Sequence, residues 1–323
     1  MKLKIAFHTP DLNIRGSCEA LWCYAHYNEI ILGNSSVIVV PLTGIQKDDR
    51  AISKFTRRFQ LVVYRDNIEL EEKLTNLGCH ILYVIKYGKN DSIPKVEKIR
   101  TVIHCVFDLS EPHGDVYAAV SEQLSKKYDS RFPFVPHMIG LQPSNKGNLR
   151  KSLNIPRDAI VFGRMGGMDT FDLKFAREAI WMAVLHKKSL YFLFMNTPKF
   201  VVHSRAIFLD GLYNNEEKNR FIQTCDAHLE AGSLGHSFGI NCGEFSVHNK
   251  PIIAYIGSVW NRSHLDIIGD KVIGFKTGDE LYSILINFNP MDYEGRDLNC
   301  YKDYSPEEVM KKFKEVFIDP FSF

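Results

Sequence analysis

The most informative part of the sequence is residues 235–253. It contains Gly235-His236-Ser237-Phe238-Gly239, followed by Glu244 and by Asn249-Lys250-Pro251-Ile252-Ile253. We interpret Phe238 to His248 as a helix, and the apolar run from Pro251 to Tyr255 as a strand-sized segment bounded by proline. The stretch therefore predicts a glycine-bearing turn that leads into a helix and then into a buried strand.

The first five of these residues also match G-x-S-x-G, the nucleophile elbow of α/β-hydrolases, with Ser237 as the nucleophile. That fold needs an acid and then a histidine later in the chain. Only His248 and His264 follow Ser237, no aspartate lies between Ser237 and His264, and Glu244 lies on the predicted helix itself. The segment from Asp226 to Leu234 also makes a poor buried strand, because it contains an aspartate, a histidine and a glutamate. A serine hydrolase is therefore disfavoured.

The same turn is better interpreted as an anion site. Ser237 to Gly239 precede a helix whose first free N–H groups and dipole would face an anion. Glu244 lies five residues beyond Gly239, where a carboxylate could accept two hydrogen bonds from a vicinal diol such as a ribose. Phosphate near the helix start and ribose further along would describe a nucleotide diphosphate.

A second anion feature is Gly163-Arg164-Met165-Gly166-Gly167, at the end of a predicted strand. The arginine presents a charged fork that matches phosphate oxygens. The glycines let the backbone approach a ligand closely. Such a sequence alone is usually a turn, but two anion features in one half of the chain favour a binding site.

Short apolar runs alternate with longer amphipathic ones along the whole chain. Strands separated by helical crossovers predict parallel sheets that are covered on both faces. In the first half we expect strands at 4–8, 36–40, 60–64, 79–85, 101–106 and 115–120, and helices at 17–32, at 68–77 and from 121. In the second half we expect strands at 159–163, 189–196, 206–210, 251–255 and 271–275, and helices at 172–185, 215–224, 238–248, 277–286 and 306–317.

A proline-rich segment separates the two halves. We predict an N-terminal α/β domain over 1–142, a linker over 143–156, a second α/β domain over 157–304, and a final helix over 305–323. Ligands of open α/β sheets bind outside the carboxyl ends of the strands. Two such domains that face each other would form a cleft suited to a two-substrate reaction that excludes water.

Composition excludes several classes of function. The 323 residues are 45% apolar and 24% charged, which is ordinary for a globular protein. With 40 basic against 38 acidic residues there is no electrostatic footprint for nucleic acid, and no apolar run approaches the ~18 residues of a membrane span. Seven scattered cysteines without a C-x-x-C pair argue against structural zinc and fit a reducing cytoplasm. No G-x-G-x-x-G follows the first strand, and neither a P-loop nor a D-x-D triplet occurs.

Two positions in the first half are further candidates. Gly16 lies in a turn of small residues that runs into a helix, where it could approach a diphosphate or sugar; the alternative is a helix start capped by Ser17. His104 ends a predicted strand, and histidines at strand ends would face the cleft. The alternative for His104 is a packed residue.

The two α/β halves and their motifs resemble those of GT-B-fold glycosyltransferases of the retaining family-4 type. Residues 235–253 resemble the family's E-x-F-G-x-x-x-x-E segment, which is followed by G-K-P-V-I. The glycine turn after the first strand, residues 163–167 and the last helix also fit, so the resemblance covers essentially the whole chain. It implies two Rossmann-like α/β domains that face each other across a cleft, with a C-terminal helix that returns to the first domain.

The resemblance implies transfer of a sugar from a nucleotide diphosphate, such as a UDP- or GDP-sugar, to a glycan or other acceptor, without a metal or cofactor. Arg164 would bind the diphosphate together with the backbone N–H groups of Ser237, Phe238 and Gly239, and donors placed where the charge develops help most. Glu244 would hold the ribose. The remaining donor-site positions would be Gly16, Gly166 and Lys174, with His104 near the sugar.

One departure affects the mechanism. The family has a glutamate eight positions before the ribose glutamate, in contact with the donor sugar, and here that position is His236. Histidine can bond a hydroxyl but is not a fixed negative charge. Retention needs no strong carboxylate base, because the leaving diphosphate can take the acceptor proton. The alternatives are a catalytically impaired nucleotide- or glycan-binding protein and a GT-B epimerase or phosphorylase.

Overall fold

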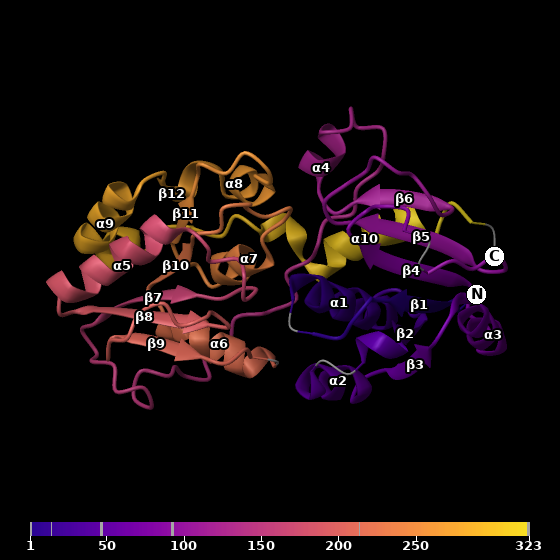
Figure 1. The fold of residues 1–323 in the computed structure, drawn as a ribbon, viewed down its shortest axis with the longest axis horizontal. Coiled ribbons are helices and arrows are strands. Elements are labelled where there is room, and N and C mark those ends of the chain that lie inside the picture. Colours follow the sequence, from indigo (N-terminus) through magenta and orange to yellow (C-terminus); the bar gives the residue numbers. More distant parts are fainter. Residues whose placement is uncertain (1, 14, 46–47, 92–93, 213, 322–323) are drawn as a thin grey trace. The chain divides into compact units, whose positions relative to one another are not determined.

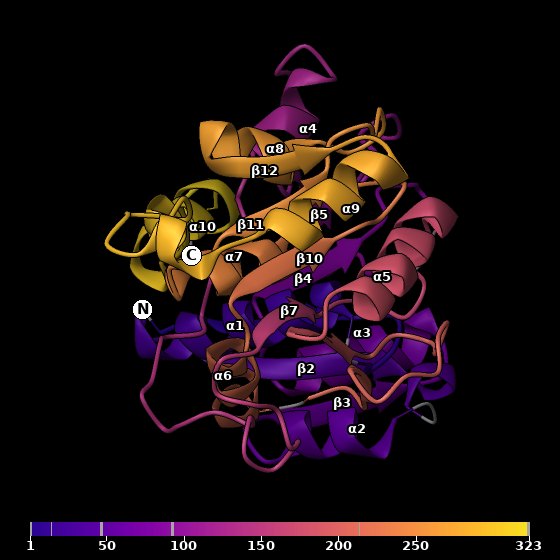
Figure 2. The same ribbon diagram turned by 90° about the vertical axis from the view of Figure 1, so that its left-hand side faces the viewer.

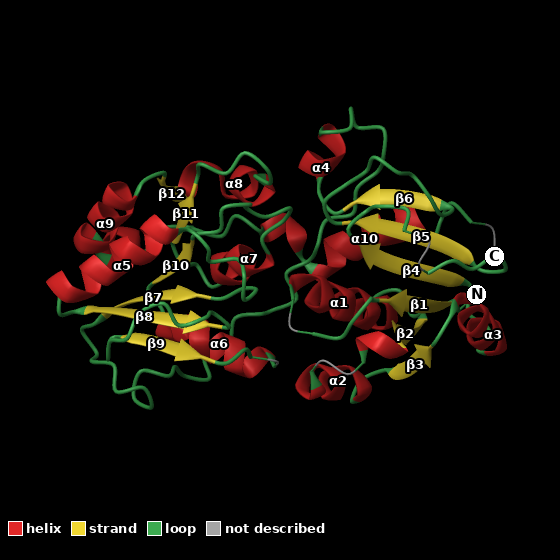
Figure 3. Cartoon of the chain, in the orientation of Figure 1, coloured by secondary structure: helices red, strands yellow, loops and turns green. Residues whose placement is uncertain are grey.

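The computed structural model describes residues 2–13, 15–45, 48–91, 94–212 and 214–321 (Figure 1). The chain forms two compact units. The first contains Met1–Gly140 and Asp303–Phe323, and the second contains Leu141–Lys302. Segment 143–156, which we predicted as a linker, therefore belongs to the second unit. Each unit alternates strands with helices (Figure 3).

The N-terminal unit is built on one parallel sheet. Among its described residues six strands pair in the order β3-β2-β1-β4-β5-β6. The strands are β1 (Lys4–His8), β2 (Ser35–Pro41), β3 (Gln60–Tyr64), β4 (Ile81–Lys86), β5 (Arg100–Cys105) and β6 (Val116–Ala119). The helices are α1 (Gly16–Ile30), α2 (Asp49–Thr56), α3 (Asn67–Asn76), α4 (Glu122–Lys126) and α10 (Pro306–Phe317), with 3-10 turns at Leu42–Gly44 and Lys302–Tyr304 beside them in the chain.

The second unit has a parallel sheet of the same kind. Its described residues form six strands in the order β12-β11-β10-β7-β8-β9. The strands are β7 (Ile160–Arg164), β8 (Leu190–Met195), β9 (Ala206–Leu209), β10 (Ala227–Glu230), β11 (Ile252–Tyr255) and β12 (Val272–Phe275). The helices are α5 (Lys174–His186), α6 (Asn215–Thr224), α7 (Ile240–Val247), α8 (Ser263–Ile268) and α9 (Gly278–Asn287), with 3-10 turns at Gly269–Lys271 and Pro290–Tyr293.

Side-chain alternation explains why both faces of the second sheet are covered. Successive side chains of a strand point to opposite faces. Phe192 and Phe194 of β8 pack in a core with residues of α5 and α9, whereas Leu193 and Met195 pack in a separate core with residues of α6 and α7. Figure 2 shows α5 and α9 side by side. The predicted continuous apolar strands are therefore confirmed as strands buried on both faces.

The helix α10 completes the N-terminal unit, although it follows the second unit in the chain. It contacts α1. The ring of Phe313 lies 5.4 Å from that of Tyr24 and 5.5 Å from that of Tyr83, and Phe313 is fully buried. The predicted return of the C-terminal helix to the first domain is confirmed. None of the helices in the described ranges is both long and apolar enough to cross a membrane.

Loss of the Phe313 ring should destabilise the N-terminal unit. Phe313→Ala removes a buried aromatic side chain that contacts α1 and β4, which typically costs about 3–5 kcal/mol of unfolding free energy. Urea unfolding followed by near-UV circular dichroism would measure this loss. The exposed Glu315→Ala on the same helix is the control and should stay within ~0.5 kcal/mol of wild type. Equal stability of both variants would contradict an integral role for α10.

Candidate functional site

The strand order of the second unit defines where a ligand would bind. The chain starts at β7, builds outward through β8 and β9, and then returns to place β10 on the other side of β7. In doubly wound sheets the crevice at this reversal point, outside the carboxyl ends of the strands, is the usual ligand site. Arg164 ends β7 and Glu230 ends β10, so both residues lie at this point.

Arg164 is fully buried, and its guanidinium donates hydrogen bonds to the loops after β7 and β8. Its Nη1 donates to the carbonyl of Asn196 (3.1 Å) and to Oγ1 of Thr197 (2.7 Å). Its Nη2 donates to the carbonyl of Gly167 (2.7 Å) and to Oγ1 of Thr170 (2.6 Å). Burial lowers the pKa of Arg164, which nevertheless stays charged because arginine is so basic. The guanidinium thus organises the loops after β7 and β8, and its role against a diphosphate stays a prediction.

Gly166 and Lys174, the two other predicted donor-site residues near Arg164, differ in their contacts and exposure. The carbonyl of Gly166 accepts a hydrogen bond from Nδ2 of Asn196 (2.9 Å), so the glycine loop is held against the loop after β8. Lys174 is the first residue of α5, and its side chain is 90% exposed and 3.8 Å from Glu178. Gly166 therefore lies in the loop at the end of β7, and the donor-site roles of Gly166 and Lys174 stay predictions.

The segment that we judged a poor strand is the central strand β10, so that judgement was wrong. All four residues of β10 are buried, and their polar side chains have partners, with the exception of Oε1 of Glu230. The carboxylate of Asp226, just before the strand, accepts from Arg150 (2.8 Å) and from the backbone of Val161 (2.7 Å). Nδ1 of His228 lies 3.2 Å from the carbonyl of Gly163. Satisfied polar groups can be buried at little cost, which propensity alone does not reveal.

Glu230 is the centre of a buried polar cluster that sequence analysis did not single out. Its Oε2 accepts a hydrogen bond from Nδ2 of Asn241 (2.8 Å) and lies 3.1 Å from Nε2 of His236. Burial by itself would raise the pKa of Glu230, but His236 and Arg164 outweigh it and hold the pKa well below its usual value. The carboxylate is therefore ionised. A strand-like alternation of polar residues over 226–230 was the available signal.

Asn241 connects three parts of this site. Besides Glu230, its Nδ2 donates to the carbonyl of Met165 (2.9 Å) in the glycine loop after β7. Asn241 is 9% exposed and lies in the first turn of α7. The side-chain amide of Asn241, in the first turn of α7, therefore connects the loop after β7 to the end of β10.

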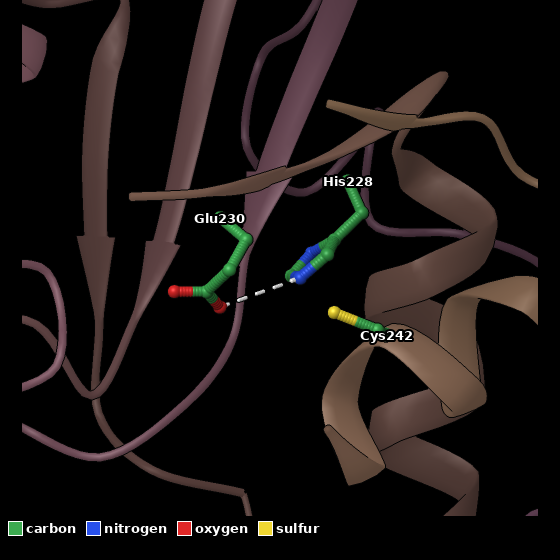
Figure 4. A group of neighbouring side chains, drawn as sticks. All are labelled: His228, Glu230 and Cys242. Carbon is green, nitrogen blue, oxygen red and sulfur yellow. Dashed lines mark ion pairs between the residues drawn. The ribbon is translucent and has the colours of Figure 1, made fainter. Parts of the chain in front are cut away.

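Three side chains of this cluster could in principle hold a metal ion. The ligand atoms of His228, Glu230 and Cys242 lie within 4.8 Å of one another, and Figure 4 shows them converging from β10 and α7. Burial raises the pKa of the Cys242 thiol well above its usual value. Because a metal needs the thiolate, binding would have to remove a proton from a buried group. Our prediction of a metal-independent protein is not tested by this geometry.

The turn before α7 has the features of an anion site. The helix begins at Ile240, slightly later than predicted, and Gly239 is its N-cap with a φ of +82°. This left-handed conformation favours glycine, which has no side chain to cap the first-turn N–H groups. Ser237 and Phe238 are buried, and the Phe238 carbonyl accepts from the Tyr301 hydroxyl (3.0 Å). The predicted involvement of Ser237, Phe238 and Gly239 in binding stays a prediction.

Glu244 is paired inside the second unit. Its Oε1 lies 2.9 Å from Nζ of Lys218 on α6, and both side chains are less than 10% exposed. Sequence analysis did not identify Lys218, because the two residues are far apart in the chain. The proposed ribose contact of Glu244 stays a prediction. Across the described ranges, no hydrogen bond joins Ser237 to a histidine, as a serine nucleophile would require.

The two candidates in the N-terminal unit lie in different environments. Gly16 is exposed and begins α1, and Arg15 rather than Ser17 occupies the N-cap position. His104 is fully buried: Nδ1 lies 2.6 Å from the Tyr83 hydroxyl, and Nε2 lies 2.8 Å from the Val135 carbonyl. The histidine was expected at a surface, but its ring faces the interior because β5 is covered on both faces. This geometry does not support a place for His104 beside the sugar.

Solved structures with the same fold span the whole chain. A glycosyltransferase from Rickettsia africae ESF-5 superposes with a TM-score of 0.71 over 98% of this chain and 99% of that chain, at 12% identity. HepE from Anabaena, in complex with UDP and glucose, gives 0.69 over 99% of this chain and 100% of that chain, at 12% identity. A proposed UDP-N-acetylglucosamine 2-epimerase from Listeria monocytogenes gives 0.64 over 100% and 99%, at 12% identity.

The fold of the chain is GT-B, as the sequence resemblance implied. No protein-family model and no curated protein matches the sequence. At 12% identity the likeness to solved structures is a likeness of fold, and function has to be argued from the site.

The burial of His104 predicts a dependence of stability on pH. Burial lowers the pKa of His104 from 6.5 to about 4, so between these pH values the unfolded chain binds a proton that the folded chain does not. As pH falls through this window, His104 should therefore lower the unfolding free energy by up to about 3 kcal/mol. His104→Gln should reduce the total pH dependence by this contribution in urea unfolding at pH 7 and pH 5. The exposed His186→Gln should leave it unchanged, and equal slopes in both variants would contradict the assignment.

Proposed function

We propose that the protein is a glycosyltransferase that moves a sugar from a nucleotide-diphosphate donor to a glycan or other acceptor. The observation that carries this proposal is the arrangement at the reversal point of the second sheet. A buried arginine, a glycine loop and the uncapped first turn of α7 gather at this point, and HepE, a solved structure with the same fold, is in complex with UDP and glucose.

The positive end of α7 would stabilise the leaving diphosphate. Its first-turn N–H groups and macrodipole favour a negative charge, and the loop held by Arg164 presents further backbone groups. A preorganised donor of this kind is typically worth about 3–4 kcal/mol in the transition state. Because these donors belong to the protein, we propose that transfer does not depend on an added metal ion.

Retention of the anomeric configuration fits this site. In a retaining transfer the departing diphosphate can accept the proton of the acceptor hydroxyl, so a strong carboxylate base is not needed. The N-terminal unit, in which Gly16 begins α1, would supply the acceptor site. The seven scattered cysteines without a C-x-x-C pair fit a reducing compartment such as the cytoplasm.

An epimerase is the second candidate, since a proposed UDP-N-acetylglucosamine 2-epimerase shares the fold over the whole chain. The two functions differ in whether an acceptor is consumed. The protein should be incubated with a panel of UDP- and GDP-sugars in EDTA, with and without glycan acceptors, and the products followed by mass spectrometry and NMR. Transfer only with an acceptor would support the glycosyltransferase, and conversion of the donor without one would support the epimerase. Neither transfer nor donor turnover across the panel would contradict both.

A negative charge introduced at the turn before α7 should weaken anion binding more than a neutral substitution of similar size. Ser237→Asp places a carboxylate next to the proposed diphosphate position, where like charges a few ångströms apart repel by several kcal/mol at the effective dielectric of a protein surface. UDP or GDP binding measured by calorimetry should weaken by roughly tenfold or more. The matched neutral variant Ser237→Asn should bind within about threefold of wild type. Equal affinities of the two variants would place the diphosphate elsewhere.

A further inference from the structure

The contact between Glu230 and His236 is the least explained feature of the site. Glu230 is 2% exposed and enters the cluster from the central strand β10. His236 lies in the turn before α7, and its side chain is 19% exposed. The imidazole therefore lies between a buried carboxylate and the surface at which we place the donor.

The environment of Glu230 is not that of an ordinary structural carboxylate. Its Oε1 is buried and has no hydrogen-bond partner among the described residues. Leaving a buried oxygen without a hydrogen-bond partner destabilises the fold, so the stability of the fold does not explain this group. A Cβ atom on Gly232 would lie 3.2 Å from this oxygen, so the neighbouring turn also depends on a residue without a side chain.

The second histidine near Glu230 is occupied elsewhere. Nδ1 of His228 lies 3.2 Å from the Gly163 carbonyl, which can only accept, so the ring proton of His228 is on Nδ1. Its Nε2 lies 3.7 Å from Glu230 and 3.5 Å from Nδ2 of Asn241. The ring is fully buried and stacks on Phe245 at 4.4 Å. His228 is therefore a packed residue and cannot donate to Glu230 while neutral.

His236 has the opposite arrangement. Its Nε2 is 3.1 Å from Oε2 of Glu230, although the N–H direction is not aligned with an acceptor in this structure. Contacts of this kind often straighten only when a substrate is bound. A carboxylate beside one ring nitrogen keeps the proton on that nitrogen, which leaves the other nitrogen as an acceptor.

We propose that Glu230 is a positioning residue that holds the ring proton of His236 on Nε2, so that Nδ1 accepts a hydrogen bond from a hydroxyl group of the donor sugar. This inference rests on the proposed function, because it takes the sugar to lie beside the α7 turn. It gives the imidazole ring of His236 the acceptor character that a carboxylate at position 236 would have.

The tautomers can be measured without knowing the sugar. Long-range ¹H–¹⁵N correlation spectra distinguish protonated from unprotonated ring nitrogens, and His228→Gln and His236→Gln would assign the signals. The expected wild-type result is a proton on Nε2 of His236 and on Nδ1 of His228. In Glu230→Gln the tautomer preference of His236 should be lost, while that of His228 should persist. A wild-type His236 with its proton on Nδ1 would overturn the proposal.

Kinetics provide the second measurement, on a donor identified from the nucleotide-sugar panel. Removal of one charged hydrogen bond should lower kcat of Glu230→Gln about 10- to 100-fold. The affinity for UDP and the KM for the donor should stay within about threefold of wild type. The exposed-carboxylate control Glu315→Gln should keep kcat within about threefold. Unchanged kcat in Glu230→Gln would overturn the positioning role. Failure of the wild-type protein to bind either UDP or GDP would instead overturn the proposed function, and the tautomer result would then decide the Glu230 assignment.

Discussion

The second unit depends on the burial of opposite charges at one point of its sheet. The guanidinium of Arg164 has no access to solvent, so the loops after β7 and β8 must supply the acceptors that it needs. Glu230 is buried on the adjacent strand, and Arg164, His236 and Asn241 surround its charge. Because an uncompensated buried charge is strongly destabilising, each of these groups restricts where the others can lie. The loops at the carboxyl ends of β7, β8 and β10 are therefore built as one polar framework.

The N-terminal unit is held together differently. Its core contains aromatic and neutral imidazole rings: Tyr24, Tyr83 and His104 contact the rings of α10 at centroid distances between 5.2 and 5.6 Å. Such rings tolerate burial because they are neutral and because His104 and Tyr83 satisfy each other by hydrogen bonding. The two units thus share a strand order but differ in the chemistry of their interiors, because the buried charged side chains lie in the second unit. This difference agrees with our proposal that the second unit binds the donor diphosphate.

Position 236 links the sequence resemblance to the geometry. A histidine there breaks the E-x-F-G-x-x-x-x-E pattern, and taken alone it argues for impaired catalysis. The structure places the carboxylate of Glu230 next to that histidine, from a strand six residues earlier in the chain. An acidic group is therefore present at the site, although it is held behind the imidazole. The glutamate of the family motif is thus replaced by histidine in the sequence, but the Glu230 carboxylate lies beside that histidine.

Most of the fold could be predicted from local pattern, because period-2 and period-3.6 apolar spacing marks strands and helices, and regular alternation of the two implies parallel sheets. The resemblance over residues 235–253 was enough to identify the GT-B architecture. Local pattern failed at β10, since Asp226, His228 and Glu230 look unsuited to a core until their partners Arg150, Gly163 and Asn241 are in place. It failed for the same reason to find Lys218 beside Glu244 and to place the His104 ring in the interior. Whether a polar side chain is a solvent-facing ligand or a satisfied interior group depends on residues distant in the chain, and only tertiary structure brings them together.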